Sequence, residues 1–425
     1  MVIPKRAARI FIALPLLAAC DGSADRSGAI VTRDSAGIRI VESSAPLLPD
    51  SSWQISSAPV LRIGTAEGDS TYALHRVYGA VRLSDGRIVI AHQPVPMLRW
   101  FDSAGVFLLG TGRGGGGPGE FSGSEGAYIS ALWGFPGDSI GTWHHESRRL
   151  QVYDDSGRYA RAVTFELPRD MPSRSYPALL GPLRTGMVLF LVPPEKRDAV
   201  GIRRDSNLYI RYRADGTQAG LMARRPGFTR YTSEISSPRG GTFRAERAPL
   251  FAPAGVGQSS GDLMYYTRGD LAQIEVFDTL GSVRLIARRA VAAQPVTEEL
   301  VAAYKQEAAD RAVASGQTSP AWWRSQQERE FDQALRADSV SHYRRLEIDR
   351  DGNIWAREPE LPGMTTVKWY VFDADGRWVT TVNTPRRFQV YEIGRDYMLG
   401  SIEDELGVEY VVLFKLDKKT GASDS

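Results

Sequence analysis

A short pattern that recurs along the chain constrains the fold more than any other feature of the sequence. In each copy an apolar segment ends in an aromatic residue, and a polar residue that opens a turn comes next. The six copies are Phe101-Asp102, Tyr153-Asp154, Tyr212-Arg213, Phe277-Asp278, Phe372-Asp373 and Phe414-Lys415. In five of them a glycine follows three residues after the turn residue, at Gly105, Gly157, Gly216, Gly281 and Gly376. Tight β-hairpins need a positive φ at such a position. The pattern predicts a divergent repeat of short antiparallel strands, with the aromatic side chains filling the space between repeat units.

The segment around the first copy indicates how one repeat unit is built. Residues 79–83, 87–91, 97–101 and 106–110 are short segments in which apolar side chains predominate, and turns rich in Asp and Gly separate them. Short strands joined by such turns are typical of an antiparallel meander. Each repeat unit is therefore predicted to be a four-stranded antiparallel sheet.

The run Gly112-Arg113-Gly114-Gly115-Gly116-Gly117-Pro118-Gly119-Glu120-Phe121 joins the first unit to the second. It resembles the Gly-Arg-x-Gly-x-Gly-Pro-Gly-Glu-Phe run that follows the outer strand of a blade in bacterial six-bladed β-propellers related to NHL-repeat proteins. Residues 346–355 resemble the Asp-x-Asp-Gly-Asn-x-Trp turn of several propeller families. The resemblance covers residues 58–417 and implies an all-β fold, a six-bladed β-propeller of four-stranded antiparallel blades. It implies no particular activity, because propellers host many unrelated functions.

Each end of the propeller region lacks part of a blade. The C-terminal part supplies three strands, at about 386–392, 397–401 and 408–416, whereas residues 60–64 read as an outer strand without inner partners. We expect the N-terminal strand to pair with the C-terminal three, because this closes the ring and removes an exposed sheet edge.

Residues 295–339 differ in character and are predicted to form a helical hairpin inserted between blades four and five. Thr297 is placed to cap a first helix, whose first turn holds two glutamates, and Ser319-Pro320 is placed to begin a second. A connection of this length is usually functional or disordered. We expect the two helices to form one wall of a cleft over the central channel, with Trp323 packed inward and Trp322 available to a ligand.

The N-terminus resembles a bacterial lipoprotein signal. A basic start is followed by the apolar residues 10–16, too short to span a bilayer, and by Leu17-Ala18-Ala19-Cys20, which resembles a lipobox. The alternative is an ordinary signal peptide cut after Ala19. The lipobox implies that residues 1–19 are removed, that Cys20 is lipidated, and that the protein is held on a membrane of the bacterial cell envelope, outside the cytoplasm. Cys20 is the only cysteine, so no internal disulfide is expected.

The sequence then divides into four parts. Residues 1–19 are the signal peptide, and residues 20–57 hold the lipidated cysteine, a tether, a hairpin and a connector. Residues 58–417 form the propeller, and residues 418–425 are a C-terminal tail. With 52 basic and 50 acidic residues the net charge is only +2, so no nucleic-acid partner is expected.

Several motifs match functional signatures only formally, and no cofactor or metal is predicted from them. Gly114–119 matches the dinucleotide fingerprint but no helix follows, and residues 257–261 match G-x-S-x-G in a turn between strands. Asp349, Asp351 and Asn353 imitate a calcium loop, yet Ile354 stands where that loop needs Gly, so a hairpin turn is the better interpretation. His144 and His145 are consecutive and would point to opposite faces of a strand.

Connections in a meander alternate between the two faces of the ring. The loops after second strands and the loops between blades share one face, here called the long-loop face, and the opposite one is the short-turn face. The candidate ligand-binding residues on the long-loop face are His92, His144, His145, Arg268, Asp270, Trp322, Arg357 and Glu358.

We expect a binding module for a protein, peptide or glycan on the long-loop face. The alternative is a propeller-type enzyme, a hydrolase, lyase or quinoprotein dehydrogenase with its site at the central channel. An enzyme needs converging catalytic groups, and the predicted inner strands read as largely apolar, which favours binding.

Overall fold

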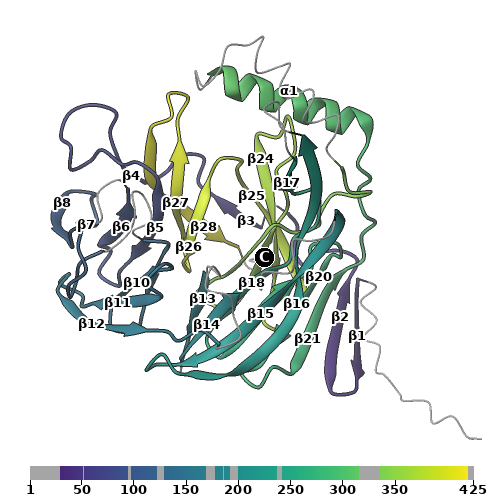
Figure 1. Ribbon diagram of the computed structural model, residues 1–425, viewed down its shortest axis with the longest axis horizontal. Helices are drawn as coiled ribbons and strands as arrows, with labels where there is room; N and C mark the ends of the chain where they lie inside the picture. Colours follow the sequence, from purple (N-terminus) through teal and green to yellow (C-terminus); the bar gives the residue numbers. More distant parts are fainter. Residues whose placement is uncertain are drawn as a thin grey trace, which may run out of the picture.

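A computed structural model describes residues 29–50, 52–93, 97–121, 129–168, 178–184, 186–191, 200–236, 242–314 and 335–419 of the chain. These residues form β-sheets arranged as the blades of a six-bladed propeller, with one α-helix outside the ring (Figure 1). The expected all-β propeller of six blades is confirmed.

The first three blades follow one another along the chain. Blade one holds β5 (Val77–Arg82), β6 (Ile88–His92), β7 (Met97–Phe101) and β8 (Phe107–Thr111). Blade two holds β9 (Ala131–Gly134), β10 (Ile140–His144), β11 (Arg149–Tyr153) and β12 (Tyr159–Thr164). Blade three holds β13 (Ala178–Leu183), β14 (Gly186–Leu191), β15 (Gly201–Arg213), β16 (Gln218–Ser236) and β17 (Thr242–Arg247).

Of the other three blades, the fourth and the sixth also carry strands from the N-terminal part of the chain. Blade four holds β18 (Val256–Ser260), β19 (Leu263–Thr267), β20 (Gln273–Phe277) and β21 (Val283–Arg289), and its outer edge carries β2 (Ile38–Ser43) and β1 (Ile30–Ser35). Blade five holds β22 (Arg345–Ile348), β23 (Ile354–Arg357), β24 (Thr366–Phe372) and β25 (Trp378–Pro385). Blade six holds β26 (Gln389–Ile393), β27 (Tyr397–Glu403) and β28 (Glu409–Lys418), with β3 (Trp53–Ile55) and β4 (Leu61–Ile63) against β28.

The hydrophobic core is divided among the interfaces between neighbouring blades. Each of the six interfaces holds its own cluster of buried apolar side chains, and each cluster contains one aromatic residue of the recurring pattern. These residues are Phe101, Tyr153, Tyr212, Phe277, Phe372 and Phe414, all buried. The prediction that they fill the space between blades is confirmed, and it explains why the pattern recurs once per blade.

The turn glycines adopt the backbone conformation that the pattern requires. Gly216, in the turn between β15 and β16, has a φ of +86°. A Cβ at this position would also lie 2.3 Å from the backbone oxygen of Thr164 in blade two. Gly216 therefore permits both the hairpin and the close approach of blades two and three.

Both ends of the chain meet in blade six. β4 pairs antiparallel with the middle of β28, and β3 pairs with the end of the same strand. The segment assigned to a connector thus supplies a strand, β3, whose Trp53 packs on Trp355 with ring centroids 5.9 Å apart. The predicted N-terminal hairpin is formed by β1 and β2, and β2 runs parallel to β21 at the edge of blade four. Residues 29–50 and 52–57 are therefore integrated into the propeller.

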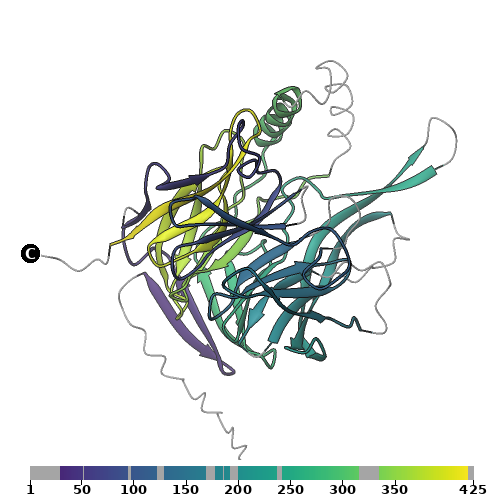
Figure 2. The same cartoon turned by 90° about the vertical axis from the view of Figure 1, so that its left-hand side faces the viewer.

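Two features extend beyond the ring. Strands β15 and β16 are longer than those of other blades, and the far part of β16 with β17 projects from the body of the molecule (Figure 2). Helix α1 (Glu298–Ala314) lies in the connection from β21 to β22. The second helix predicted after it falls outside the described residues.

Candidate functional site

The inner strands of the blades surround a central cavity of about 590 Å³. Contacts link β5 with β9, β13 with β18, β18 with β22, β22 with β26, and β26 with β5, so side chains from distant parts of the chain converge there. The lining includes first-turn residues such as Leu83, Asp138, Gly261 and Arg350. The cavity therefore reaches the short-turn face, opposite to the face predicted to bind the ligand.

One wall of this cavity carries a pair of opposite charges on β22. Arg345 Nε lies 2.7 Å from Glu347 Oε1, and the other carboxylate oxygen of Glu347 accepts a hydrogen bond of 3.2 Å from Gln258 Nε2 on β18. Residues two apart on a strand share a face, which is why both side chains reach the same wall. The result is an ion pair with one neutral hydrogen-bonding group beside it.

A second acidic group enters from β26. The Glu392 carboxylate pairs with Arg350, accepts a 2.6 Å hydrogen bond from the Tyr397 hydroxyl, and accepts the Arg82 backbone N–H at 3.0 Å. Burial raises the pKa of Tyr397, and the nearby Glu392 charge raises it further. Glu392 therefore joins blades one, five and six at the cavity wall.

The turn that imitates a calcium loop is a hairpin between β22 and β23. Asp349 accepts hydrogen bonds from the backbone N–H groups of Asp351 and Asn353 and from Trp355 Nε1 at 2.8–3.0 Å. Lys418 Nζ lies 3.0 Å from the same carboxylate. Asp349 is thus occupied in holding the turn, and no group of ligands suited to a metal ion occurs among the described residues.

The histidines predicted as ligand-binding residues lie at the ends of second strands. His92 is buried, its Nδ1 lies 2.9 Å from the Gln93 carbonyl oxygen, and burial together with the Arg99 charge lowers the pKa of His92 to about 4. His144 is also buried, with Nδ1 2.7 Å from the Ser147 hydroxyl, and its ring stacks on His145. None of the three lines the central cavity.

The charged candidates form local contacts on the long-loop face. Arg268 and Asp270 pair with each other at 2.9 Å, and Asp270 also pairs with Arg204 at 2.8 Å. Arg357 pairs with Glu360 at 2.7 Å, while Glu358 accepts the Lys368 backbone N–H at 2.9 Å. The structure brings Arg268 and Asp270 together and stacks His144 on His145, but the candidates do not share one cavity. Among the candidates in the described ranges, Glu358 lines the smaller of the two cavities, a space of about 180 Å³.

Three predicted residues lie outside the described part of the chain: Cys20, Trp322 and Trp323. The lipidation of Cys20 and the contrasting roles of the two tryptophans stay predictions.

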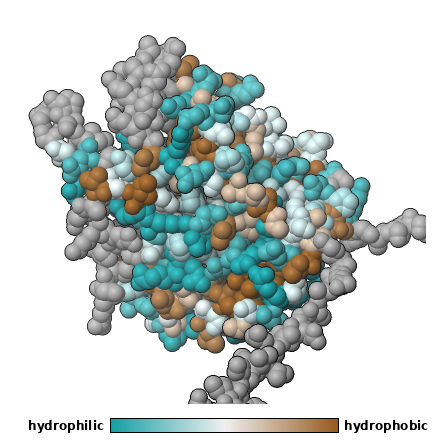
Figure 3. Space-filling model, turned by 90° about the vertical axis from the view of Figure 1, so that its right-hand side faces the viewer, coloured by the Kyte–Doolittle hydropathy of each residue, from teal (hydrophilic) through white to brown (hydrophobic). Residues whose placement is uncertain are grey.

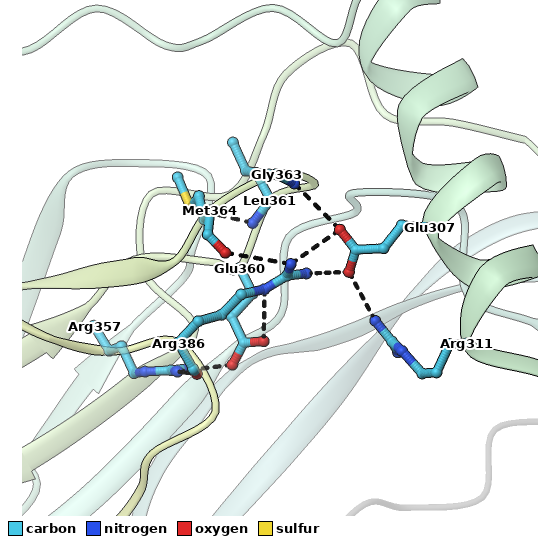
Figure 4. A network of polar contacts seen from close by, with 8 residues as sticks. All are labelled: Glu307, Arg311, Arg357, Glu360, Leu361, Gly363, Met364 and Arg386. Atoms are coloured by element: carbon cyan, nitrogen blue, oxygen red, sulfur yellow. Dashed lines mark hydrogen bonds and ion pairs between the residues drawn. The ribbon is translucent and has the colours of Figure 1, made fainter. Parts of the chain in front are cut away.

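Helix α1 rests on the long-loop face through a polar contact. Glu307 faces Arg386 with both carboxylate oxygens, at 2.6 and 2.9 Å, and one oxygen accepts the Gly363 N–H at 3.2 Å (Figure 4). Gly363 follows the second strand of blade five and Arg386 precedes blade six, so both belong to this face. Of the helix residues only Val301 is buried, so the apolar contact of α1 with the ring is small.

The charged lining of the central cavity was not predicted from the sequence. The inner strands were expected to be largely apolar, yet those at residues 343–348 and 388–393 contain Arg345, Glu347 and Glu392. The alternation of charged and apolar residues in these strands was the available signal. This alternation predicts that each strand has one polar face. Which neighbouring blades that face contacts depends on how the ring closes.

Comparisons with solved structures find similar proteins at low sequence identity. A putative exported protein from Bacteroides fragilis is 12% identical, with 90% of this chain and 100% of that chain covered and a TM-score of 0.44. A member of the DUF4221 family from Bacteroides vulgatus is 11% identical, with 87% and 99% covered and a TM-score of 0.46. Virginiamycin B lyase from Staphylococcus aureus is 10% identical, with 86% and 99% covered and a TM-score of 0.36. No protein-family model matches the chain, and a search of curated proteins finds no match.

Two further features concern the exterior of the molecule: the distribution of hydrophobic residues on its surface and the apolar character of its helix. On the side drawn in Figure 3, hydrophobic residues form separate patches among hydrophilic ones. Large continuous apolar patches are typical of stable protein interfaces, and the described residues on this side do not form one. In the described ranges no helix has both the length and the apolar character needed to cross a bilayer.

Proposed function

We propose that this protein is a lipid-anchored, extracytoplasmic binding protein whose ligand enters the central cavity from the short-turn face. The observation that carries the proposal is the lining of that cavity, where polar and charged side chains from five blades converge on about 590 Å³. Concave sites with a few converging polar groups are the usual location of ligand binding. The proposal keeps the binding function expected from the sequence and assigns it to the opposite end of the channel.

The state of the carboxylates supports binding over catalysis. Glu347 is paired with Arg345, and Glu392 is paired with Arg350 and accepts two further hydrogen bonds. A general acid or base must be able to exchange a proton with the substrate. Carboxylates held by several donors serve better as fixed charges that orient a ligand.

The chemistry of the lining favours a polar ligand of peptide or glycan type. Gln258 and Ser260 provide neutral donors and acceptors, Tyr78 provides an aromatic ring, and both signs of charge are present. Peptides and sugars carry donors and acceptors along their length, and sugars also stack on aromatic rings. A purely apolar ligand would leave the charged groups without compensation.

A muropeptide, which contains both a disaccharide and a short peptide, tests this proposal. Binding of the soluble domain should be measured calorimetrically for the whole muropeptide, the disaccharide alone and the peptide alone. Ser260→Trp, which places a large side chain at the cavity, should weaken binding by about tenfold or more. Ala104→Trp, in an exposed turn on the same face, is the matched control and should leave binding unchanged.

Two results would overturn the proposal. Absence of measurable binding for all three probes would exclude this ligand class, and equal effects of the two substitutions would exclude the cavity as the site. Conversion of a probe into a new product would support the enzyme alternative.

The lipid anchor rests on the N-terminal lipobox and has its own test. Mature protein from bacterial membranes should carry acyl mass on its first residue, and Cys20→Ala should abolish both that mass and membrane retention. Mature wild-type protein without acyl mass would refute lipidation and leave the binding proposal intact.

A further inference from the structure

The smaller cavity lies on the long-loop face, where blades four and five meet beside the base of the helical insertion. Its polar lining comes from Arg289, Gln294, Ser341, His342 and Glu358. Its apolar lining comes from Val291, Ala292, Val340, Pro359, Leu361 and Met364, with the Tyr370 ring at one side. The space of about 180 Å³ is separate from the central cavity and shares no lining residue with it.

Arg289, the last residue of β21, is held in this wall by aromatic rings. Its guanidinium carbon lies 3.3 Å from the ring centroid of Tyr370 and 5.1 and 5.7 Å from those of Trp378 and Tyr343. Stacking holds the plane of the guanidinium but does not satisfy its N–H groups, which point outward in that plane. The cation is therefore fixed in orientation with its donors directed past the rings.

The charge of Arg289 is not neutralised within the described residues. The guanidinium forms no ion pair there, and its buried Nε has no hydrogen-bond partner. The Tyr343 hydroxyl lies beside the guanidinium and is neutral, so it does not offset the charge. By contrast, Arg386 on the same face makes a two-pronged pair with Glu307 (Figure 4). A partly buried arginine without an anion is costly, because desolvation weakens the charged form.

The acidic residue in the lining, Glu358, is already engaged. Glu358 accepts the Lys368 backbone N–H at 2.9 Å and the Tyr370 hydroxyl at 3.2 Å. It does not pair with Arg289, yet its charge remains close to the cavity. One cation beside one engaged carboxylate favours a singly charged anion over a doubly charged phosphate. The second negative charge of the phosphate would be repelled by Glu358 and would have no further cation to pair with.

We propose that this cavity binds a small aliphatic monocarboxylate, with its carboxylate on Arg289 and its hydrocarbon part against Val340, Leu361 and Met364. The guanidinium presents parallel N–H donors that match the two oxygens of a carboxylate. The apolar residues form the remainder of the wall and suit a short branched chain. This site does not depend on the ligand of the central cavity.

The first experiment compares 3-methylbutanoate with 3-methylbutanamide, which has the same shape without the charge. Wild-type protein should bind the carboxylate at least about tenfold more tightly than the amide. Arg289→Gln should reduce carboxylate affinity by about tenfold or more, whereas Arg288→Gln should leave it within about twofold. Arg288 is the matched control because it neighbours Arg289 on β21 but turns to Gln273, with Nε 2.7 Å from the Gln273 amide oxygen.

The second experiment uses wild-type protein only, so it does not depend on how the variants fold. Burial and the Arg289 charge lower the pKa of His342, whereas the Asp270 charge raises it; Glu358 is the carboxylate in the lining of the cavity. A bound carboxylate offsets the Arg289 charge, so saturating 3-methylbutanoate should raise the pKa of His342 in an NMR titration. The amide should leave that pKa unchanged.

The proposal is overturned if wild-type protein binds carboxylate and amide equally, or if Arg289→Gln binds the carboxylate as wild type does. It is also overturned if saturating carboxylate does not change the pKa of His342, or if inorganic phosphate binds more tightly than the carboxylate. Absence of carboxylate binding up to about 10 mM would also overturn the proposal, since a desolvated ion pair should bind with a Kd well below that concentration.

Discussion

The contact between Glu307 and Arg386 should decide whether helix α1 stays docked on the propeller. Both carboxylate oxygens of Glu307 face the guanidinium, and the Gly363 N–H donates to one of them. Only 17% of the Arg386 side chain and 28% of the Glu307 side chain are exposed. Only Val301 of the helix is buried, and Tyr304 contacts the Phe251 ring, so we expect this pair to supply a large part of the contact with blades five and six.

The size of the effect follows from the carboxyl's proton affinity. The hydrogen bond from Arg386 is the largest cause that lowers the pKa of Glu307 to about 2, from an ordinary value of 4.5. Such a difference corresponds to at most about 3 kcal/mol at neutral pH. Solvent reaches part of both side chains and screens the pair, so about 1–2 kcal/mol is the realistic contribution to docking.

Hydrogen exchange of the α1 amides measures this contribution directly. Glu307→Gln keeps the helix propensity and the side-chain length but removes the charge. A loss of about 1–2 kcal/mol should accelerate local opening of α1 about 5- to 30-fold, with exchange of the blade strands unchanged. Asp310→Asn is the control, because Asp310 contacts Gln306 within the helix.

The pH dependence has a defined direction. A carboxyl with a lowered folded-state pKa stabilises docking above the unfolded pKa, and that stability is lost as the pH falls through the folded value. Protection of α1, corrected for intrinsic exchange, should therefore fall between about pH 4.5 and pH 2 in wild type and stay flat in Glu307→Gln. Equal opening of the Gln and Asn variants, or parallel pH profiles, would refute the reasoning.

Two further predictions concern the ring itself. Trp53→Ala should lower stability by about 3 kcal/mol in a denaturant melt, because it leaves a cavity between blades five and six; Val60→Ala, at an exposed position nearby, should cost almost nothing, and equal losses would mean that β3 is not part of the core. Gly216→Ala should cost about 3 kcal/mol, since it combines positive-φ strain with a backbone clash. Gly352→Ala has a similar φ of +87° but open space around the added methyl group, so it should cost only about 1 kcal/mol. A Gly216→Ala variant no less stable than Gly352→Ala would show that the close approach of the blades is not tight.

The sequence by itself determined the blade architecture. Residues such as Phe101 and Gly105 carry local information, because a tight turn needs a glycine with positive φ and a blade interface needs one large buried ring. These requirements repeat with every blade, so six aromatic and turn pairs predicted six blades. The orphan strand at residues 60–64 also predicted where the chain returns, since an unpaired sheet edge is costly.

Only the tertiary structure decided what the blades bring together. The strand β3 is too short to read from the sequence, and it is defined by pairing with β28 and by the packing of Trp53 on Trp355. Glu347 meets Gln258 near the central channel, and Arg289 meets Tyr370 further out, both between blades four and five. Such contacts depend on closure of the ring and on the twist between blades, which are properties of long-range packing. Local patterns determine which side chains share a strand face, whereas the closed ring determines which faces meet, and so where a ligand finds a cavity.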